Sequence, residues 1–184
     1  MYSAYTASLI KSFVALHGAD IVNSINNTGL FFPAVVGQLS VESANGTSSL
    51  AQNYNNYGGI KGDAQNGVAL STTEGNNKTA SVAYFKKYDS FAEFMIDYVS
   101  NLQSDKYVNA GVFTATSPED QITKMVEAGY STMTPSAYLA GGVQDRIDAT
   151  RDIFQLGTIS STSVADNSTT QTQTNCTPIT QFNF

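Results

Sequence analysis

The hydrophobic pattern changes its period once, between residues 57 and 88, and this change limits the possible folds most strongly. Before and after this stretch, apolar residues recur every three or four positions, as on the buried face of an α-helix. Within it, "VALSTTE" and "TASVAYFKKY" are typical of strands and are separated by the turn-forming "GNN". We therefore expect a mainly helical α+β domain with one small antiparallel β-lobe at about residues 57–88.

The segments after the β-lobe carry clear helix signals. Asp89 or Ser90 suits the N-cap of a helix whose apolar face has the strongest amphipathic pattern in the chain. That face is formed by Phe91, Phe94, Met95, Tyr98, Val99 and Leu102. Two further helices are expected after Ser117 and Thr134, because each hydroxyl precedes a proline at the first helical position. We expect these helices to end at Gly129 and Gly157.

The two ends of the chain differ in character. Near the N-terminus, a helical stripe is predicted for Tyr5, Leu9, Phe13 and Leu16, with His17 at the surface or in a cap. Residues 158–184 are rich in Ser and Thr and contain no Lys or Arg. We interpret residues 1–157 as one domain and residues 158–184 as a flexible tail. That tail either is ordered by a protein partner, with "ITQFNF" as a docking strand, or has no role.

Composition excludes several classes of function. A net charge of −6 argues against DNA or an anionic membrane as a partner, but it does not exclude a polysaccharide. No apolar run approaches the length of a membrane span. The single cysteine, Cys176, cannot form an internal disulfide and has no His or acid nearby. No metal or cofactor is expected, and the start "MYSAYTASLIKSF" does not have the pattern of a signal peptide.

One carboxylate occupies the apolar face of the segment before the β-lobe. Val35, Leu39 and Glu42 fall at i, i+4 and i+7 of a predicted helix. Apolar surroundings and the negative end of the helix dipole both favour the protonated form of a carboxyl. Glu42 is therefore either a general acid or half of a structural ion pair with Lys or Arg, and its spacing alone fits both.

The residues around Glu42 resemble a known family. "GQLSVESANGTSSLAQNYNNYGGIKG" is similar to the motif of glycoside hydrolase family 73, the bacterial N-acetylglucosaminidases that include many autolysins and the flagellar wall hydrolase. The matching positions, in order, are Gln38, Glu42, Ser43, Gly46, Ser49, Leu50, Ala51, Asn55, Asn56, Gly59, Ile60, Lys61 and Gly62. "STTEGNNKTASVAYFKKYDS" and "AGYSTMTPSAY" resemble later segments of the family, so the resemblance covers about residues 5–155.

The resemblance implies a lysozyme-like fold whose β-lobe borders the active-site cleft, and it implies three catalytic positions. Glu42 matches the general acid, Glu74 in "STTEG" the second acid, and Tyr130 in "AGYST" the functional tyrosine. Either Glu74 activates a water, which gives inversion, or the acetamido oxygen of the substrate attacks, which gives retention. In the second route Tyr130 would orient the acetamido group. Read without the resemblance, Glu74 is an ordinary exposed strand acid, and Tyr130 fits a half-buried core residue as well as a residue that faces the cleft.

Substrate contacts are expected from the same motif. The candidates are Gln38, Tyr54, Asn55, Asn56 and Tyr57, with the two tyrosines as sugar-stacking platforms or as core residues. The tryptophan that accompanies the general acid in the family is missing from "SANG". Its absence changes the expected floor of a sugar subsite. Thr134 replaces an aspartate of the family before the proline, a change expected to affect only a turn.

The function implied by the resemblance is that of a bacteriolytic peptidoglycan hydrolase. It would cleave the β-1,4 bond between N-acetylglucosamine and N-acetylmuramic acid in the glycan strand. Without a signal peptide, we expect it to act at the bacterial cell wall as a phage lysin or a particle-borne hydrolase. The alternatives are a muramidase, a lytic transglycosylase, or a non-catalytic wall-binding or virion or injection-machine protein that retains the fold.

Overall fold

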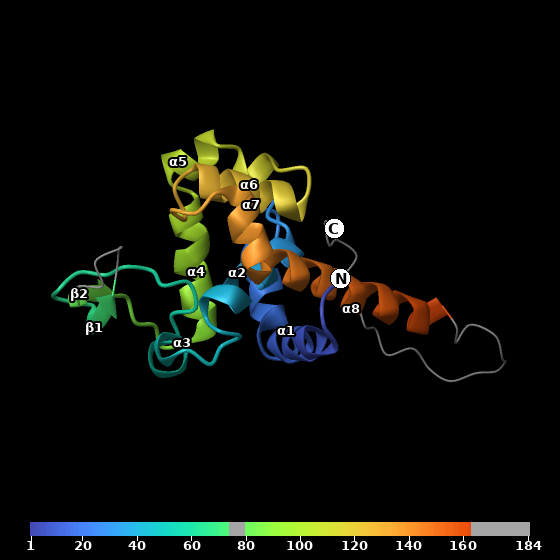
Figure 1. Cartoon of the computed structure of the whole chain (residues 1–184), viewed down its shortest axis with the longest axis horizontal. Helices are drawn as coiled ribbons and strands as arrows, with labels where there is room; N and C mark the ends of the chain where they lie inside the picture. The colour runs from blue at the N-terminus through green and yellow to red at the C-terminus, as the bar shows by residue number, and fades with distance from the viewer. Residues whose placement is uncertain (74–79, 163–184) are drawn as a thin grey trace.

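A computed structural model describes residues 1–73 and 80–162. Its elements in chain order are α1 (Ala4–Ile25), α2 (Phe32–Glu42), α3 (Ser49–Tyr54), β1 (Val68–Thr73), β2 (Ala80–Phe85), α4 (Phe91–Leu102), α5 (Asp105–Asn109), η1 (Val112–Thr114), α6 (Pro118–Glu127), α7 (Pro135–Tyr138), η2 (Leu139–Val143) and α8 (Gln144–Thr162). Figure 1 shows the long helices gathered into one body, from which the two strands project to one side. The predicted mainly helical α+β fold with one small antiparallel sheet is confirmed.

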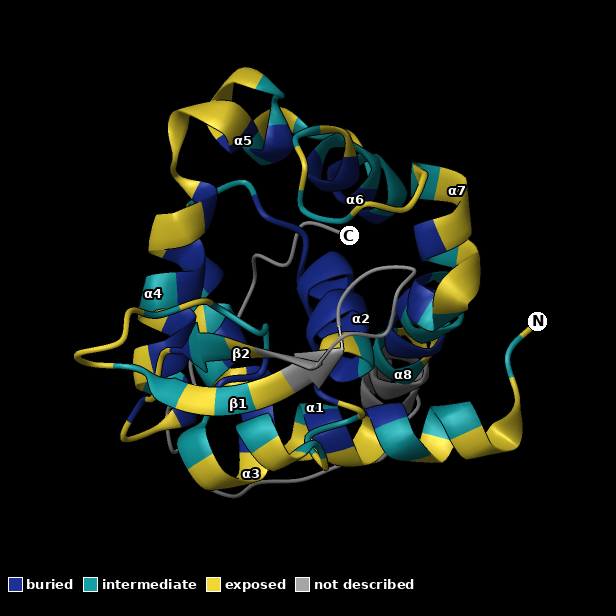
Figure 2. Ribbon diagram, turned by 60° about the vertical axis from the view of Figure 1, so that its left-hand side comes forward, coloured by how far each residue is buried: buried dark blue, intermediate teal, exposed yellow. Residues whose placement is uncertain are grey.

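Helix α2 lies at the centre of this body. Every residue from Phe32 to Ser40 is buried, and α2 packs against α1, α6, α8 and η2. In Figure 2 it is the dark blue helix enclosed by the others. A helix surrounded in this way must be apolar on all sides, which explains the run "FPAVVGQL". Its central position carries the last residue of α2, Glu42, to the edge of the core.

The buried face of α1 differs from the predicted stripe. Ile10, Phe13, His17 and Ile21 are buried, whereas Leu16 is 74% exposed and Tyr5 is also exposed. The reason is that α1 packs against three helices, α2, α4 and α8. The residues of α1 that face these helices are also three or four positions apart, but they are not the residues of the predicted stripe. The prediction that Tyr5 and Leu16 belong to the buried stripe was therefore wrong.

His17 is a core residue, contrary to the expected surface or cap role. Its ring centre lies 4.1 Å from that of Phe91, 4.8 Å from that of Tyr57 and 4.9 Å from that of Phe13. Burial lowers the pKa of His17, although the charge of Asp20 opposes this shift. The neutral imidazole thus packs as part of an aromatic cluster that joins α1 to α4.

The β-lobe forms as predicted within residues 57–88. Strands β1 and β2 pair antiparallel, from Val68 opposite Phe85 to Thr73 opposite Ala80. The segment before β1 also lies along β2, because the Gly62 amide donates to the Tyr84 carbonyl at 2.9 Å. This third segment brings residues 60–62 to the inner edge of the lobe.

Hydroxyl caps fix the helix starts after the β-lobe. The side-chain oxygens of Ser90, Ser117 and Thr134 accept hydrogen bonds from the backbone amides three residues later, at 3.1, 3.0 and 3.3 Å. These predictions are confirmed. The predicted end at Gly157 is wrong, since α8 continues to Thr162. One glycine inside a helix costs only about 1 kcal/mol relative to alanine and does not have to end it.

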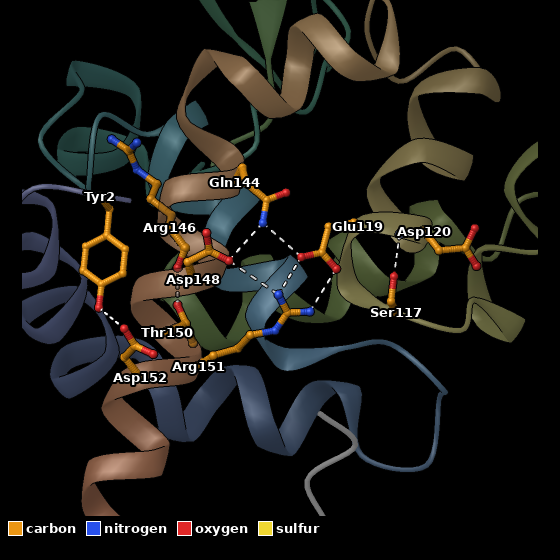
Figure 3. Close-up of polar contacts among 10 residues, drawn as sticks. All are labelled: Tyr2, Ser117, Glu119, Asp120, Gln144, Arg146, Asp148, Thr150, Arg151 and Asp152. Carbon is orange, nitrogen blue, oxygen red and sulfur yellow. Dashed lines mark hydrogen bonds and ion pairs between the residues drawn. The ribbon is translucent and has the colours of Figure 1, made fainter.

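A polar network joins α8 to α6 across the surface of the core (Figure 3). Arg151 donates to both carboxylate oxygens of Glu119, at 2.5 and 2.9 Å, and Gln144 donates to the same carboxylate at 3.0 Å. Burial alone would raise the pKa of Glu119, but the Arg151 and Gln144 hydrogen bonds outweigh it and lower that pKa to about 2. This network fixes α8, and therefore the turn that precedes it, against α6.

Candidate active site

A cavity of about 610 Å³ lies between the β-lobe and the helical body. The residues that line it are Glu42, Gly58, Gly59, Ile60, Lys61, Phe85, Lys86, Tyr98, Asn101, Leu102, Lys106, Tyr107, Gly129, Tyr130 and Ser131. They come from the end of α2, the inner edge of the lobe, α4, α5 and the turn after α6. Two of the three predicted catalytic residues, Glu42 and Tyr130, are thus brought to one cavity.

Glu42 is the last residue of α2, and its side chain is exposed. We expected the apolar face of the helix to bury it, and that expectation was wrong. The helix ends here because the Ser43 hydroxyl donates to the Leu39 carbonyl at 2.6 Å and accepts from the Gly46 amide at 2.8 Å. Val35 and Leu39 do enter the core as predicted. One turn further on, the chain leaves the core, so Glu42 faces the cavity instead.

One buried tyrosine holds the Glu42 carboxyl. The Tyr138 hydroxyl donates to Glu42 Oε1 at 2.5 Å, although the two residues are 96 positions apart in the chain. Tyr138 is 7% exposed, and its ring packs edge-on against that of Tyr130, with ring centres 6.2 Å apart. Burial raises the pKa of Tyr138, and the nearby Tyr130 and Glu42 add to this rise. The phenol therefore remains protonated and remains a hydrogen-bond donor.

Sequence reasoning missed Tyr138, but a signal for it was present. It closes "AGYSTMTPSAY", the segment in which Tyr130 was selected, and it follows the predicted cap at Thr134. A helix that starts at a fixed cap places its fourth residue one turn later on a defined face. The contact between the Tyr138 hydroxyl on that face and the Glu42 carboxyl, however, is a tertiary contact that residue spacing does not reveal.

A second polar contact lies behind the cavity wall. The Tyr98 hydroxyl donates to Gln38 Oε1 at 2.5 Å, and both side chains are almost fully buried. Gln38 Nε2 makes no hydrogen bond to any residue that the structure describes. Burial raises the pKa of Tyr130, Glu42 adds to the rise, and the nearby Gln38 amide opposes it. Gln38 therefore lies on the core side of Tyr98 and Tyr130, two tyrosines that line the cavity.

Three of the five expected substrate contacts are buried in the fold and do not line the cavity. Gln38 is 0% exposed, and Tyr57 packs within the aromatic cluster around His17. Asn56 is also buried, and its amide donates to the carbonyls of Ile60 and Lys86 at 2.9 Å each. These bonds join the two chain segments that enter and leave the β-lobe, which is why the amide is unavailable to a ligand.

The other two expected contacts are less enclosed but do not line the cavity. Tyr54 is half-buried at the end of α3. Asn55 adopts a left-handed conformation after it, and its amide donates to the Tyr88 carbonyl at 2.9 Å. A role for any of the five residues in substrate binding stays a prediction.

The second predicted acid, Glu74, lies outside the described residues. Cys176 and the segment "ITQFNF" lie outside them as well. Within residues 1–73 and 80–162, no group of three or more His, Cys, Asp or Glu side chains is arranged to hold a metal ion. No helix in the same ranges has the length and apolar character needed to cross a membrane.

Solved structures share this fold. The glycoside hydrolase domain of FlgJ from Salmonella typhimurium superimposes with a TM-score of 0.62 and 23% identity, covering 84% of this chain and 96% of that domain. The catalytic domain of the autolysin Auto from Listeria monocytogenes also gives 0.62, with 21% identity and coverage of 78% and 84%. At these identities, the likeness concerns the fold alone.

Sequence comparisons identify the family. Peptidoglycan hydrolase FlgJ of Pseudomonas aeruginosa is 34% identical over 108 residues, which is 53% of this chain and 27% of that protein. The chain thus corresponds to about a quarter of that relative's length. Residues 19–148 match the model of the glucosaminidase family, described as mannosyl-glycoprotein endo-β-N-acetylglucosaminidase. This match spans most of the domain and includes Glu42, Tyr130 and Tyr138. The chain therefore belongs to the glucosaminidase family, as its motif predicted.

Proposed function

We propose that this protein is a peptidoglycan hydrolase that cleaves the β-1,4 bond between N-acetylglucosamine and N-acetylmuramic acid. The observation that carries this proposal is the Glu42 carboxyl, which borders the 610 Å³ cavity and is held through one oxygen by Tyr138. A cavity of this size suits a small number of sugar rings. The peptidoglycan hydrolase FlgJ, which shares 34% identity, supports the choice of substrate.

Glu42 acts as the general acid. A positioned carboxylic acid protonates the leaving glycosidic oxygen as the bond breaks. Because Tyr138 occupies Oε1, we assign the transferred proton to Oε2. The hydrogen bond also restricts rotation of the carboxyl, so less orientation has to be achieved when the substrate binds.

The second step proceeds by one of two routes. Glu74 activates a water that attacks the sugar, or the acetamido oxygen of the substrate attacks with Tyr130 as its orienting group. The routes differ in the anomer that is first released. Inversion together with loss of activity in Glu74→Gln would support the water route, and retention would support the acetamido route. Tyr130 lines the cavity, which supports its placement near the substrate in both cases.

The experiment that tests the proposal is cell-wall clearing by Glu42→Gln. This substitution keeps the shape of the side chain but removes its proton transfer, so activity should fall by roughly 10²- to 10⁴-fold. Glu127→Gln is the matched control, because Glu127 is exposed at the end of α6 and does not line the cavity. Wall clearing by Glu42→Gln at the wild-type rate would remove Glu42 as the acid and favour a binding protein.

A further inference from the structure

The charge of the cavity is opposite to that of the whole chain. The chain carries a net charge of −6 and only nine Lys and Arg residues. Among the described residues that line the cavity, the charged ones are Glu42, Lys61, Lys86 and Lys106. A third of the cations of an acidic protein thus border one cavity. A local excess of cations attracts anionic ligands, and a neutral glycan would gain nothing from it.

The three lysines differ in their surroundings. Lys86 is paired with Asp97 at 2.9 Å, so much of its charge is already balanced. Lys61 lies over the ring of Phe85, with its ammonium 4.1 Å from the ring centre. Lys106 lies over the ring of Tyr107 at 4.3 Å, and it forms no ion pair with any described residue. Lys106 is therefore the cavity cation best suited to bind an anion.

Tyr107 supports Lys106 at the cavity. Tyr107 is 4% exposed, so its ring is fixed in the core while one face meets the ammonium. A cation–π contact of this kind holds the position of an ammonium without neutralising its charge. Lys106 and Tyr107 both line the cavity, whereas their neighbour Asp105 does not. The ammonium is thus both placed in the cavity and available to a ligand.

We propose that Lys106 forms a subsite for carboxylates of the substrate. This inference rests on the proposed function, because peptidoglycan carries carboxylates that chitin-like glycans lack. Their sources are the stem peptides and, where a peptide has been removed, the lactyl group of muramic acid. The subsite would strengthen the binding of anionic glycan relative to neutral glycan without a part in the bond-breaking step.

The test compares soluble substrates that differ in the carboxylates they carry. The substrates are peptide-bearing peptidoglycan fragments, the same fragments with their carboxylates blocked as neutral amides, and peptide-free strands with free lactyl carboxylates. For Lys106→Gln, KM for the peptide-bearing fragments should rise roughly two- to fivefold, as expected from the loss of one exposed ion pair. The value of kcat should not change, and added salt should reduce the difference in KM.

Two further variants and the blocked fragments serve as controls. Lys106→Arg should restore the wild-type KM, and Lys11→Gln should leave it unchanged, since Lys11 is exposed on α1 and away from the cavity. A KM effect on both charged substrates would show that the subsite accepts either carboxylate. An effect on peptide-free strands alone would assign the contact to the lactyl group, and an effect on peptide-bearing fragments alone would assign it to the stem peptide. The same rise in KM with the blocked fragments, or no rise with any charged substrate, would overturn the subsite.

Failure of the proposed function gives a different result. Wild-type protein that releases no fragments from any of the three substrates would contradict hydrolysis itself. Wild-type protein that cleaves charged and blocked fragments with equal KM would contradict only the carboxylate subsite.

Discussion

Glu42 reaches the cavity with one carboxyl oxygen already occupied by a phenol. The donor, Tyr138, is buried and remains protonated, so the contact persists over the range of pH in which a carboxyl titrates. We therefore regard Tyr138 as a positioning residue that sets the orientation of the Glu42 carboxyl.

Tyr138→Phe tests this role. Loss of a hydrogen bond to a charged group costs about 1.5–3 kcal/mol, so kcat should fall roughly ten- to a hundredfold while KM changes little. The measurement is steady-state kinetics of both proteins, which separates kcat from KM.

The matched control is Tyr84→Phe, which removes a hydroxyl from a half-buried tyrosine on β2 outside the cavity lining. It should keep the wild-type kcat and KM. A wild-type kcat in Tyr138→Phe would show that the Tyr138 hydroxyl does not position the acid.

Single residues show clearly where sequence reasoning reached its limit. Glu42 and Tyr130 were selected because their motif is local and ordered along the chain, and both line the cavity. The burial of His17, Asn56 and Gln38 was not foreseen, because it depends on which helices meet around them. The same holds for Tyr138, whose contact joins positions 96 residues apart.

The elements around the site are joined by an irregular turn that follows Tyr138. Between α7 and α8 lies η2, a single π-helical turn, and within it Gly142 has a φ of +113°. Only glycine adopts this conformation readily, and π-turns inside helices are frequently found at functional sites. The turn lets α7 and α8 take different directions, so Tyr138 can meet Glu42 while α8 packs along the core. A continuous helix from Thr134 was predicted, although the pair of glycines at 141 and 142 is a local signal for a break.

Gly142→Ala should disturb this arrangement, whereas Gly141→Ala should not. Alanine at position 142 would be forced into a strained backbone conformation, which should lower the free energy of unfolding by about 1–3 kcal/mol. Gly141 is exposed, and a Cβ there would meet no atom within 4 Å. The comparison is made by denaturant unfolding and by kcat. Equal stability and equal kcat in the two variants would show that the turn does not position Tyr138.

The whole molecule combines a helical body, whose centre is α2, with a β-lobe connected through Asn55 and Asn56. Its general architecture was predictable, since hydroxyl caps and the change of hydrophobic period are local properties of the sequence. The packing around α1 was not predictable, because three helices contact α1 from different sides. The cavity arises only where lobe and body meet, so its cationic lining could not be predicted from any one segment.

The bond that is cleaved is the most direct measure of what this molecule does. Purified peptidoglycan is digested with the wild-type protein, the products are reduced with borohydride, and the fragments are analysed by mass spectrometry. We expect reduced N-acetylglucosamine at the new chain ends, as cleavage after this sugar requires. Reduced N-acetylmuramic acid would instead indicate a muramidase, and 1,6-anhydro ends would indicate a lytic transglycosylase; either product would contradict the proposed glucosaminidase activity.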